Sequence, residues 1–103
     1  MIKVTAVYPQ REGARMDAAY YVERHVPLVR RLVGDSLKGA SVSRGLASIA
    51  PGQPAPFVLV ADFLFESVDT FQAAFGPHAQ QIMADVPNFT DIAPQIFISE
   101  VLA

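Results

Sequence analysis

The chain opens with a regular alternation of apolar and polar residues. From Ile2 to Tyr8 every second residue is apolar, and Lys3 and Thr5 occupy positions between them. Successive side chains of a β-strand point to opposite faces of a sheet, and β-branched residues favour strands. The segment therefore predicts a strand with one buried face, followed by a loop that starts at Pro9.

The apolar positions of the next segment recur every three or four residues, which is the spacing of a helix with one buried side. Asp17 is suited to cap its first turn, because a carboxylate there accepts hydrogen bonds from the free backbone N–H groups. Gly34 is suited to end the helix. Pro27 lies in the interior, where proline costs about 3 kcal/mol in an ordinary helix. We therefore expect an unusual local geometry near it. The buried side of this helix comprises Val22, Val26, Val29, and Leu32 or Val33.

Two further strands are predicted in the middle of the chain. The segment from Leu37 to Ile49 alternates in polarity, and Gly39 and Gly45 within it suggest a bend or bulge. The loop from Pro51 to Pro56 separates it from the segment Phe57 to Glu66, which is apolar on both faces apart from one carboxylate. Strands of that kind occupy central positions in sheets, so we expect this one to be central.

A second helix and a last strand complete the pattern. Ser67 can cap the helix, Gly76-Pro77 breaks or kinks it, and it resumes from His78 to Val86. Pro94 to Leu102 is the last strand. The order strand, helix, strand, strand, helix, strand is typical of the ferredoxin-like βαββαβ fold, an α+β architecture whose four-stranded antiparallel sheet carries both helices on one face. Residues 1–103 are expected to form this single domain.

The predicted sheet leaves one apolar face uncovered. Both helices lie on one side, so the second apolar face of the central strand requires another apolar surface. The simplest source is the same face of a second copy, related by a two-fold axis. We therefore expect a homodimer formed through the open sheet face.

The composition argues against several classes of function. The formal net charge is −2 and the pI is near 5.5, whereas nucleic-acid binding calls for a basic surface. The chain has no cysteine for disulfides or thiolate sites, and its longest apolar run is too short to span a bilayer. It opens directly as a strand rather than as a secretion signal. We expect a cytoplasmic protein that binds neither nucleic acid nor a membrane.

Two histidines are the leading candidates for chemistry. His25 lies one helical turn after Tyr21, and it is either a general acid or base facing a cleft or a helix histidine bonded to a carbonyl that Pro27 leaves free. His78 follows Pro77, where a helix N-terminus favours neutral imidazole. It could also be a partly exposed capping residue.

The other polar candidates also have structural interpretations, and for the two tyrosines core filling is the more usual one. Tyr20 and Tyr21 either fill the core or hold a ligand oxygen. Asp62 interrupts an apolar strand, so it either faces a pocket or is paired at the dimer contact. Arg44 on the neighbouring strand is the natural partner for an ion pair. The chain has no histidine spacing typical of metal sites and no glycine-rich phosphate or dinucleotide loop. We therefore expect no bound metal and no organic cofactor.

Two runs of the sequence together resemble the signatures of the EthD family. The first is Asp17-Ala-Ala-Tyr-Tyr-Val-Glu-Arg-His-Val-Pro-Leu28, and the second combines Phe71-Gln-Ala-Ala-Phe-Gly-Pro-His78-Ala with Ala84-Asp-Val-Pro-Asn-Phe-Thr-Asp91. The resemblance extends over essentially the whole chain. It implies a dimeric α+β barrel made from two ferredoxin-like subunits, with pockets between the helices and the sheet.

The resemblance also implies which residues form the site. His25 matches the helix histidine of the family, His78 matches the histidine after Gly-Pro, and Asn88 and Phe89 match the Asn-Phe pair that closes the pocket end. Some similar isomerases use a tyrosine on the second strand. This chain has serines there, at positions 41 and 43, so that particular chemistry is not expected.

Barrels of this kind include polyketide cyclases, isomerases, cofactor-free monooxygenases and haem-handling proteins. The resemblance therefore implies a small enzyme acting on a hydrophobic oxygenated compound, in xenobiotic catabolism or in aromatic or polyketide metabolism. Two alternatives remain open at this point, a carrier that sequesters such a compound without turnover and a haem-binding protein.

Overall fold

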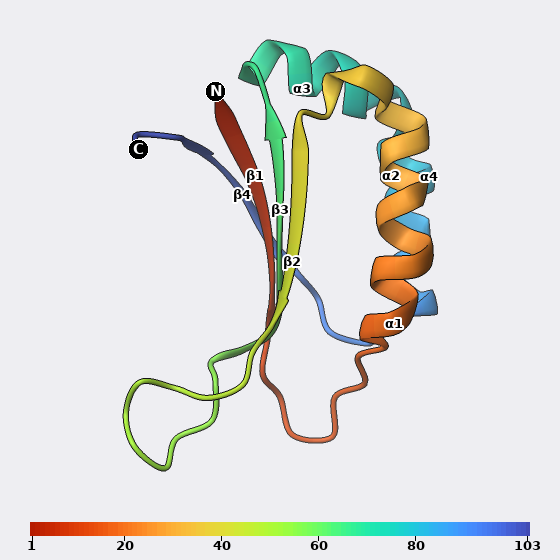
Figure 1. The fold of residues 1–103 in the computed structure, drawn as a ribbon. Helices are drawn as coiled ribbons and strands as arrows, with labels where there is room; N and C mark the ends of the chain where they lie inside the picture. Colours follow the sequence, from red (N-terminus) through yellow and green to blue (C-terminus); the bar gives the residue numbers. More distant parts are fainter.

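The computed structural model describes residues 1–103 and contains one antiparallel sheet of four strands (Figure 1). The order across the sheet is β2-β3-β1-β4, so β1 and β3 are central and β2 and β4 form the edges. This is the ferredoxin-like arrangement predicted from the order of elements. The strands are β1 (Ile2–Pro9), β2 (Gly39–Arg44), β3 (Phe57–Phe65) and β4 (Gln95–Glu100).

Two helical arms lie on one face of this sheet and leave the other face open (Figure 1). Each arm changes helix type along its length. None of the helices is both long and apolar enough to cross a membrane. The first arm comprises α1 (Ala18–Tyr20), the π-helical turn η1 (Tyr21–His25), α2 (Val26–Val33) and the 3₁₀ turn η2 (Gly34–Ser36). The second comprises α3 (Val68–Phe75), the 3₁₀ turn η3 (Gly76–His78), α4 (Ala79–Ala84) and the 3₁₀ turn η4 (Val86–Asn88).

The helix ends follow the capping rules used for the prediction. The carboxylate of Asp17 accepts a 3.0 Å hydrogen bond from the backbone N–H of Tyr20. The hydroxyl of Ser67 accepts one of the same length from the backbone N–H of Thr70. Gly34 ends α2 with a φ of 63°, a conformation that glycine adopts without steric cost. The capping and stop signals read from the sequence are thus confirmed.

The second strand is shorter than the predicted span from Leu37 to Ile49. Its pairing with β3 ends where Arg44 faces Leu59. Continued in the same register, the strand would bring Ala47 opposite Pro56 and Ile49 opposite Pro54, and proline has no N–H to donate to a ladder, so pairing could not extend over the whole predicted span. The chain leaves the sheet here as a long loop, the yellow-green segment at the lower left of Figure 1. Ile49 in that loop is fully exposed.

The alternation of residues along the strands divides them between core and open face as predicted. The helix-facing positions of β1 and β3 are buried, and with Tyr21, Val29 and Ile82 from the helical arms they form the core. The open face of β3 carries Val58, Val60, Asp62 and Leu64, all half-buried. The core positions of the two strands are Val4, Ala6, Tyr8, Leu59, Ala61, Phe63 and Phe65.

The expected ion pair between Asp62 and Arg44 does not form. Asp62 faces Ser41 across the sheet, three positions before Arg44 on β2. An odd separation along a strand puts two side chains on opposite faces, so Arg44 lies on the helix side. Asp62 instead accepts a 2.6 Å hydrogen bond from the hydroxyl of Thr5, and Nζ of Lys3 lies 4.0 Å from the same oxygen.

Candidate active site

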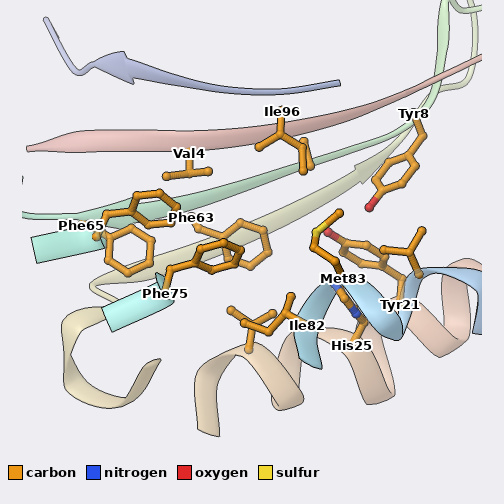
Figure 2. Close-up of a pocket in the computed structure, with 14 residues that line it drawn as sticks. Val4, Tyr8, Tyr21, His25, Phe63, Phe65, Phe75, Ile82, Met83 and Ile96 are labelled. Carbon is orange, nitrogen blue, oxygen red and sulfur yellow. The ribbon is translucent and has the colours of Figure 1, made fainter. Parts of the chain in front are cut away.

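A cavity of about 180 Å³ lies between the helical arms and the sheet. Its walls come from β1, β3 and β4 on one side and from the helical arms on the other (Figure 2). Of its 14 lining residues 13 are hydrophobic, and the exception is His25. A cavity of about 150 Å³ with hydrocarbon walls stays dry and accepts benzene. The cavity therefore has room for a single aromatic ring.

The π-helical turn η1 places His25 in the cavity wall. At its end the N–H of Val26 donates to the carbonyl of Tyr21, one residue further back than in an α-helix. Such turns are rare and often occur at functional sites. They also explain how the helix accommodates Pro27, which falls in the first turn of α2, where its missing N–H costs little. Tyr21 and His25, one turn apart, are only 1% and 5% exposed.

A carboxylate from the second helical arm holds the ring of His25. Asp85 directly follows α4, and its Oδ2 lies 2.9 Å from Nδ1 of the imidazole. The exposed fractions of the two side chains are 6% for His25 and 12% for Asp85. The pair ties the two arms together at the cavity wall.

Two further donors reach the other oxygen of the same carboxylate. The hydroxyl of Tyr20 donates to Oδ1 of Asp85 over 2.7 Å, and the side-chain amide of Asn88 donates to it over 2.9 Å. Burial by itself raises the pKa of the Asp85 carboxyl, but the hydrogen bonds from Tyr20, Asn88 and His25 outweigh burial and lower that pKa below its ordinary value of 3.8. Asp85 is therefore ionised at neutral pH.

The second ring nitrogen of His25, Nε2, has no hydrogen-bond partner within the chain. Every fully buried polar side-chain atom of this protein does have one. Nε2 is therefore accessible, and the ring to which it belongs borders the cavity. This nitrogen is the atom through which His25 can meet a bound molecule.

Two phenols supply the other polar atoms of the cavity wall. Tyr8 extends from β1 and Tyr21 from η1, and their rings meet edge to face with centroids 5.9 Å apart (Figure 2). Burial raises the pKa of both hydroxyls. Both therefore stay protonated at neutral pH and can donate hydrogen bonds to a ligand oxygen.

Phe89 packs against the imidazole and completes its surroundings. The centroid of its ring lies 4.8 Å from that of His25 and 5.0 Å from that of Tyr21. The residue is fully buried. Close packing of this kind restricts rotation of a side chain, so Phe89 helps to fix the direction of the imidazole.

Two of the residues expected at the site lie outside this cluster. His78 is half-buried in η3 and does not line the cavity. Asp62 lies on the open face of the sheet, on the far side from the cavity. No three side chains of the types that bind metal ions lie close together. The other expected residues surround or adjoin the imidazole: His25, Tyr20, Tyr21, Asn88 and Phe89.

Sequence reasoning missed Asp85 and Tyr8. Asp85 lies within the run from Ala84 to Asp91 that carries the family resemblance, three residues before Asn88. Its position at the end of an amphipathic helix was the available signal, but nothing along the chain pointed to His25, 60 residues away. Tyr8 was read only as a residue of the buried strand face, which is correct but incomplete.

Comparison with known proteins places this arrangement in a family. The model of the EthD domain matches residues 15–93. An EthD-like protein from Ralstonia eutropha is 44% identical, with a TM-score of 0.94 over 99% of this chain and 92% of that one. The search of curated proteins gave no match.

More distant solved structures share the fold. An ethyl tert-butyl ether D (EthD) family protein from Bacillus halodurans is 22% identical, with a TM-score of 0.69 over 99% of both chains. A dimeric ferredoxin-like protein of unknown function from Thermobifida fusca is 14% identical, with a TM-score of 0.59 over 97% of this chain and 90% of that one. The domain match and the similarity to the Ralstonia protein show that this chain belongs to the EthD family.

Proposed function

We propose that this protein is a small cofactor-free enzyme acting on a hydrophobic, oxygenated compound bound between the helical arms and the sheet. The observation that carries the proposal is a single imidazole, with one unbonded nitrogen, in an otherwise hydrophobic cavity wall. Histidine is the commonest general acid or base in enzymes. A cavity that excludes water strengthens its interactions with a bound molecule.

The chemistry of the walls supports a neutral class of substrate. No lysine or arginine lines the cavity, so a carboxylate or phosphate would be buried there without a counter-charge, at high cost. A neutral ring with a carbonyl or hydroxyl group suits it better. Nε2 of His25 would take a proton from such a compound, while the phenols of Tyr8 and Tyr21 would donate hydrogen bonds to its oxygen.

Proton removal of this kind is a first step shared by several reactions. An enolate or phenolate formed in the cavity can isomerise, cyclise or react with dioxygen. The proposal therefore includes an isomerase or cyclase and a monooxygenase or other oxidoreductase, in xenobiotic catabolism or in aromatic or polyketide metabolism. It assigns no ligand contact to His78 or Asp62, because neither lines the cavity.

A non-catalytic carrier is the second candidate, favoured by the same hydrophobic walls. Such a protein needs a cavity of this kind but no base. Native mass spectrometry on protein purified gently from its host would identify a co-purifying ligand for either function. Turnover separates the two, since only an enzyme has a rate to lose.

The decisive test compares the turnover of His25→Gln with that of the unchanged protein. Single-ring aromatic ketones and phenols serve as trial substrates. We expect turnover to fall on the order of 10²-fold or more, the usual contribution of a positioned base, while ligand affinity stays within a few-fold. His78→Gln should retain turnover, because that side chain lies outside the cavity. A carrier would bind these compounds without turnover even in the unchanged protein. An equal loss of turnover in His25→Gln and His78→Gln would indicate that His78 also takes part.

We further propose a homodimer formed through the open sheet face. Half-buried Val58, Val60 and Leu64 lie on that face of β3, and no helix covers it (Figure 1). Phe97 on the same face of β4 is 52% exposed. Asp62 is already hydrogen bonded to Thr5, so burying this face would not leave the carboxylate without a partner.

A further inference from the structure

The carboxylate of Asp85 uses its two oxygens for different partners. Tyr20 and Asn88 both donate to Oδ1, and Oδ2 alone faces Nδ1 of His25. An ionised carboxylate only accepts hydrogen bonds, so a neutral imidazole can bind Oδ2 only with its proton on Nδ1. The hydrogen bond made by one ring nitrogen decides the state of the other. The nitrogen at the cavity then carries a lone pair rather than a proton.

We propose that Asp85 is a positioning residue that fixes the tautomer of His25, so that Nε2 meets the ligand as a proton acceptor. This inference rests on the proposed function of the cavity. In the step it supports, the O–H bond of a phenol or the C–H bond beside a carbonyl breaks, and an N–H bond forms on Nε2. The electron pair stays on the ligand as a phenolate or enolate. The resulting imidazolium faces the Asp85 carboxylate at 2.9 Å.

The same arrangement specifies the ligand more closely. Unprotonated Nε2 can only accept a hydrogen bond or a proton. The ligand that meets it must therefore carry an acidic proton. Weakly acidic phenols and enolisable aromatic ketones meet this requirement. Esters and ethers without such a proton do not, although they are equally hydrophobic.

Tyr20 and Asn88 make the role of Asp85 testable, because they distinguish its two oxygens. In Asp85→Asn the present donor roles of Tyr20 and Asn88 favour an oxygen at the Oδ1 position. We therefore expect the new amide group to turn its NH₂ toward Nδ1 of His25, where it donates instead of accepting. This replacement should move the imidazole proton to Nε2. An equivalent change in the serine-protease triad leaves the geometry intact and selects the wrong tautomer.

The first measurement is NMR correlation of the ring protons with the two ring nitrogens. The chain has only 2 histidines, so the spectrum of His25→Gln identifies the signals of His25, and His78 provides an internal reference. We expect protonated Nδ1 and unprotonated Nε2 in the unchanged protein, and the reverse in Asp85→Asn. Asp91→Asn is the matched control, because that carboxylate contacts Arg11 and Arg15 instead. A neutral imidazole with its proton on Nε2 and not on Nδ1 in the unchanged protein would overturn the proposal even if Asp85→Asn failed to fold.

The second measurement uses para-nitrophenol, whose absorption distinguishes phenol from phenolate. The bound probe should be more ionised than the free probe at a weakly acidic pH, and Asp85→Asn should reduce the effect to the level of His25→Gln. Equal ionisation in the unchanged protein and Asp85→Asn would contradict the role of Asp85. If the probe does not bind but the tautomer still reverses, the positioning role stands and the proposed substrate class fails.

Discussion

The imidazole of His25 is the group on which the proposed chemistry depends. One nitrogen is held by the half-buried carboxylate of Asp85 and the other is unbonded at a hydrophobic cavity. Removing a partner from a buried polar group costs more than the hydrogen bond itself is worth, so Asp85, Tyr20 and Asn88 are expected to depend on one another. These hydrogen bonds also join Tyr20 and His25 of the first helical arm to Asp85 at the end of the second. They therefore contribute to the fold as well as to the site.

This coupling predicts a dependence of stability on pH. The pKa of Asp85 is lower in the folded protein than its ordinary value of 3.8. The stabilisation is therefore complete above that value and is lost as the pH falls through the lower, folded-state pKa. Urea unfolding at about pH 6 and about pH 3 gives the loss in the free energy of unfolding between the two pH values. We expect this loss to be larger in the unchanged protein than in Asp85→Asn. Asp91, whose pKa is also lowered, is present in both proteins, so its contribution cancels in the comparison. An equal loss in the free energy of unfolding in both proteins would contradict the prediction.

Among the elements, the first helical arm and the edge strand β2 depart most from regular geometry. The arm contains a π-turn where Pro27 follows the site residues. The strand ends at Arg44, and the N–H of the next residue, Gly45, donates to the carbonyl of Val58 over 3.0 Å. A side chain on Gly45 would collide with the backbone carbonyl of Phe57. Each irregularity is associated with one residue whose backbone chemistry does not suit a regular element.

The close approach at the end of β2 predicts different results for its two glycines. Gly45→Ala should destabilise the protein by about 1–3 kcal/mol, the usual cost of overpacking against atoms that cannot move away. Gly39→Ala, at the other end of the strand, meets only the Cδ1 end of Leu64 at 3.2 Å, which can shift. Its effect should be well below that of Gly45→Ala. Urea unfolding of both variants checks this, and equal stabilities would show that the loop after β2 readily moves away.

For the whole molecule, the uneven cover of the sheet is the main feature. The helical arms cover one face (Figure 1), and the cavity lies beneath them, so the candidate site does not use the open face. A dimer through the open face would therefore leave each cavity within its own subunit. In that arrangement assembly would stabilise the sheet, and the proposed site would remain between the helical arms and the sheet of each subunit.

We expect sedimentation to give a dimer at micromolar concentration. Val60→Asp adds a charge to the open face and should yield monomers, because an unpaired buried carboxylate is costly. Val68→Asp adds the same charge on the helical side, at a 38% exposed position in the first turn of α3. It should leave the dimer intact. A monomeric unchanged protein would refute the assembly, and dissociation of both variants would place the interface elsewhere.

The fold could be predicted almost completely because local patterns carry it. Alternation fixed the faces of β1 and β3, and Asp17 and Ser67 marked the helix starts correctly. The length of β2 could not be predicted. It depends on how far the pairing with β3 continues, and that pairing ends where Arg44 faces Leu59. The pairing of Asp62 with Thr5 instead of Arg44 depends on the same cross-strand register.

For the site, the sequence by itself determined its chemical members, since imidazole, phenol and amide groups are properties of residues such as His25, Tyr21 and Asn88. Their arrangement was decided only by the tertiary structure. The two arms pack so that Asp85 meets a histidine 60 residues away, while Asp62 faces the other side of the sheet. Periodicity records which way a side chain points within its own element. Contacts between elements depend on how those elements dock, which no local pattern encodes.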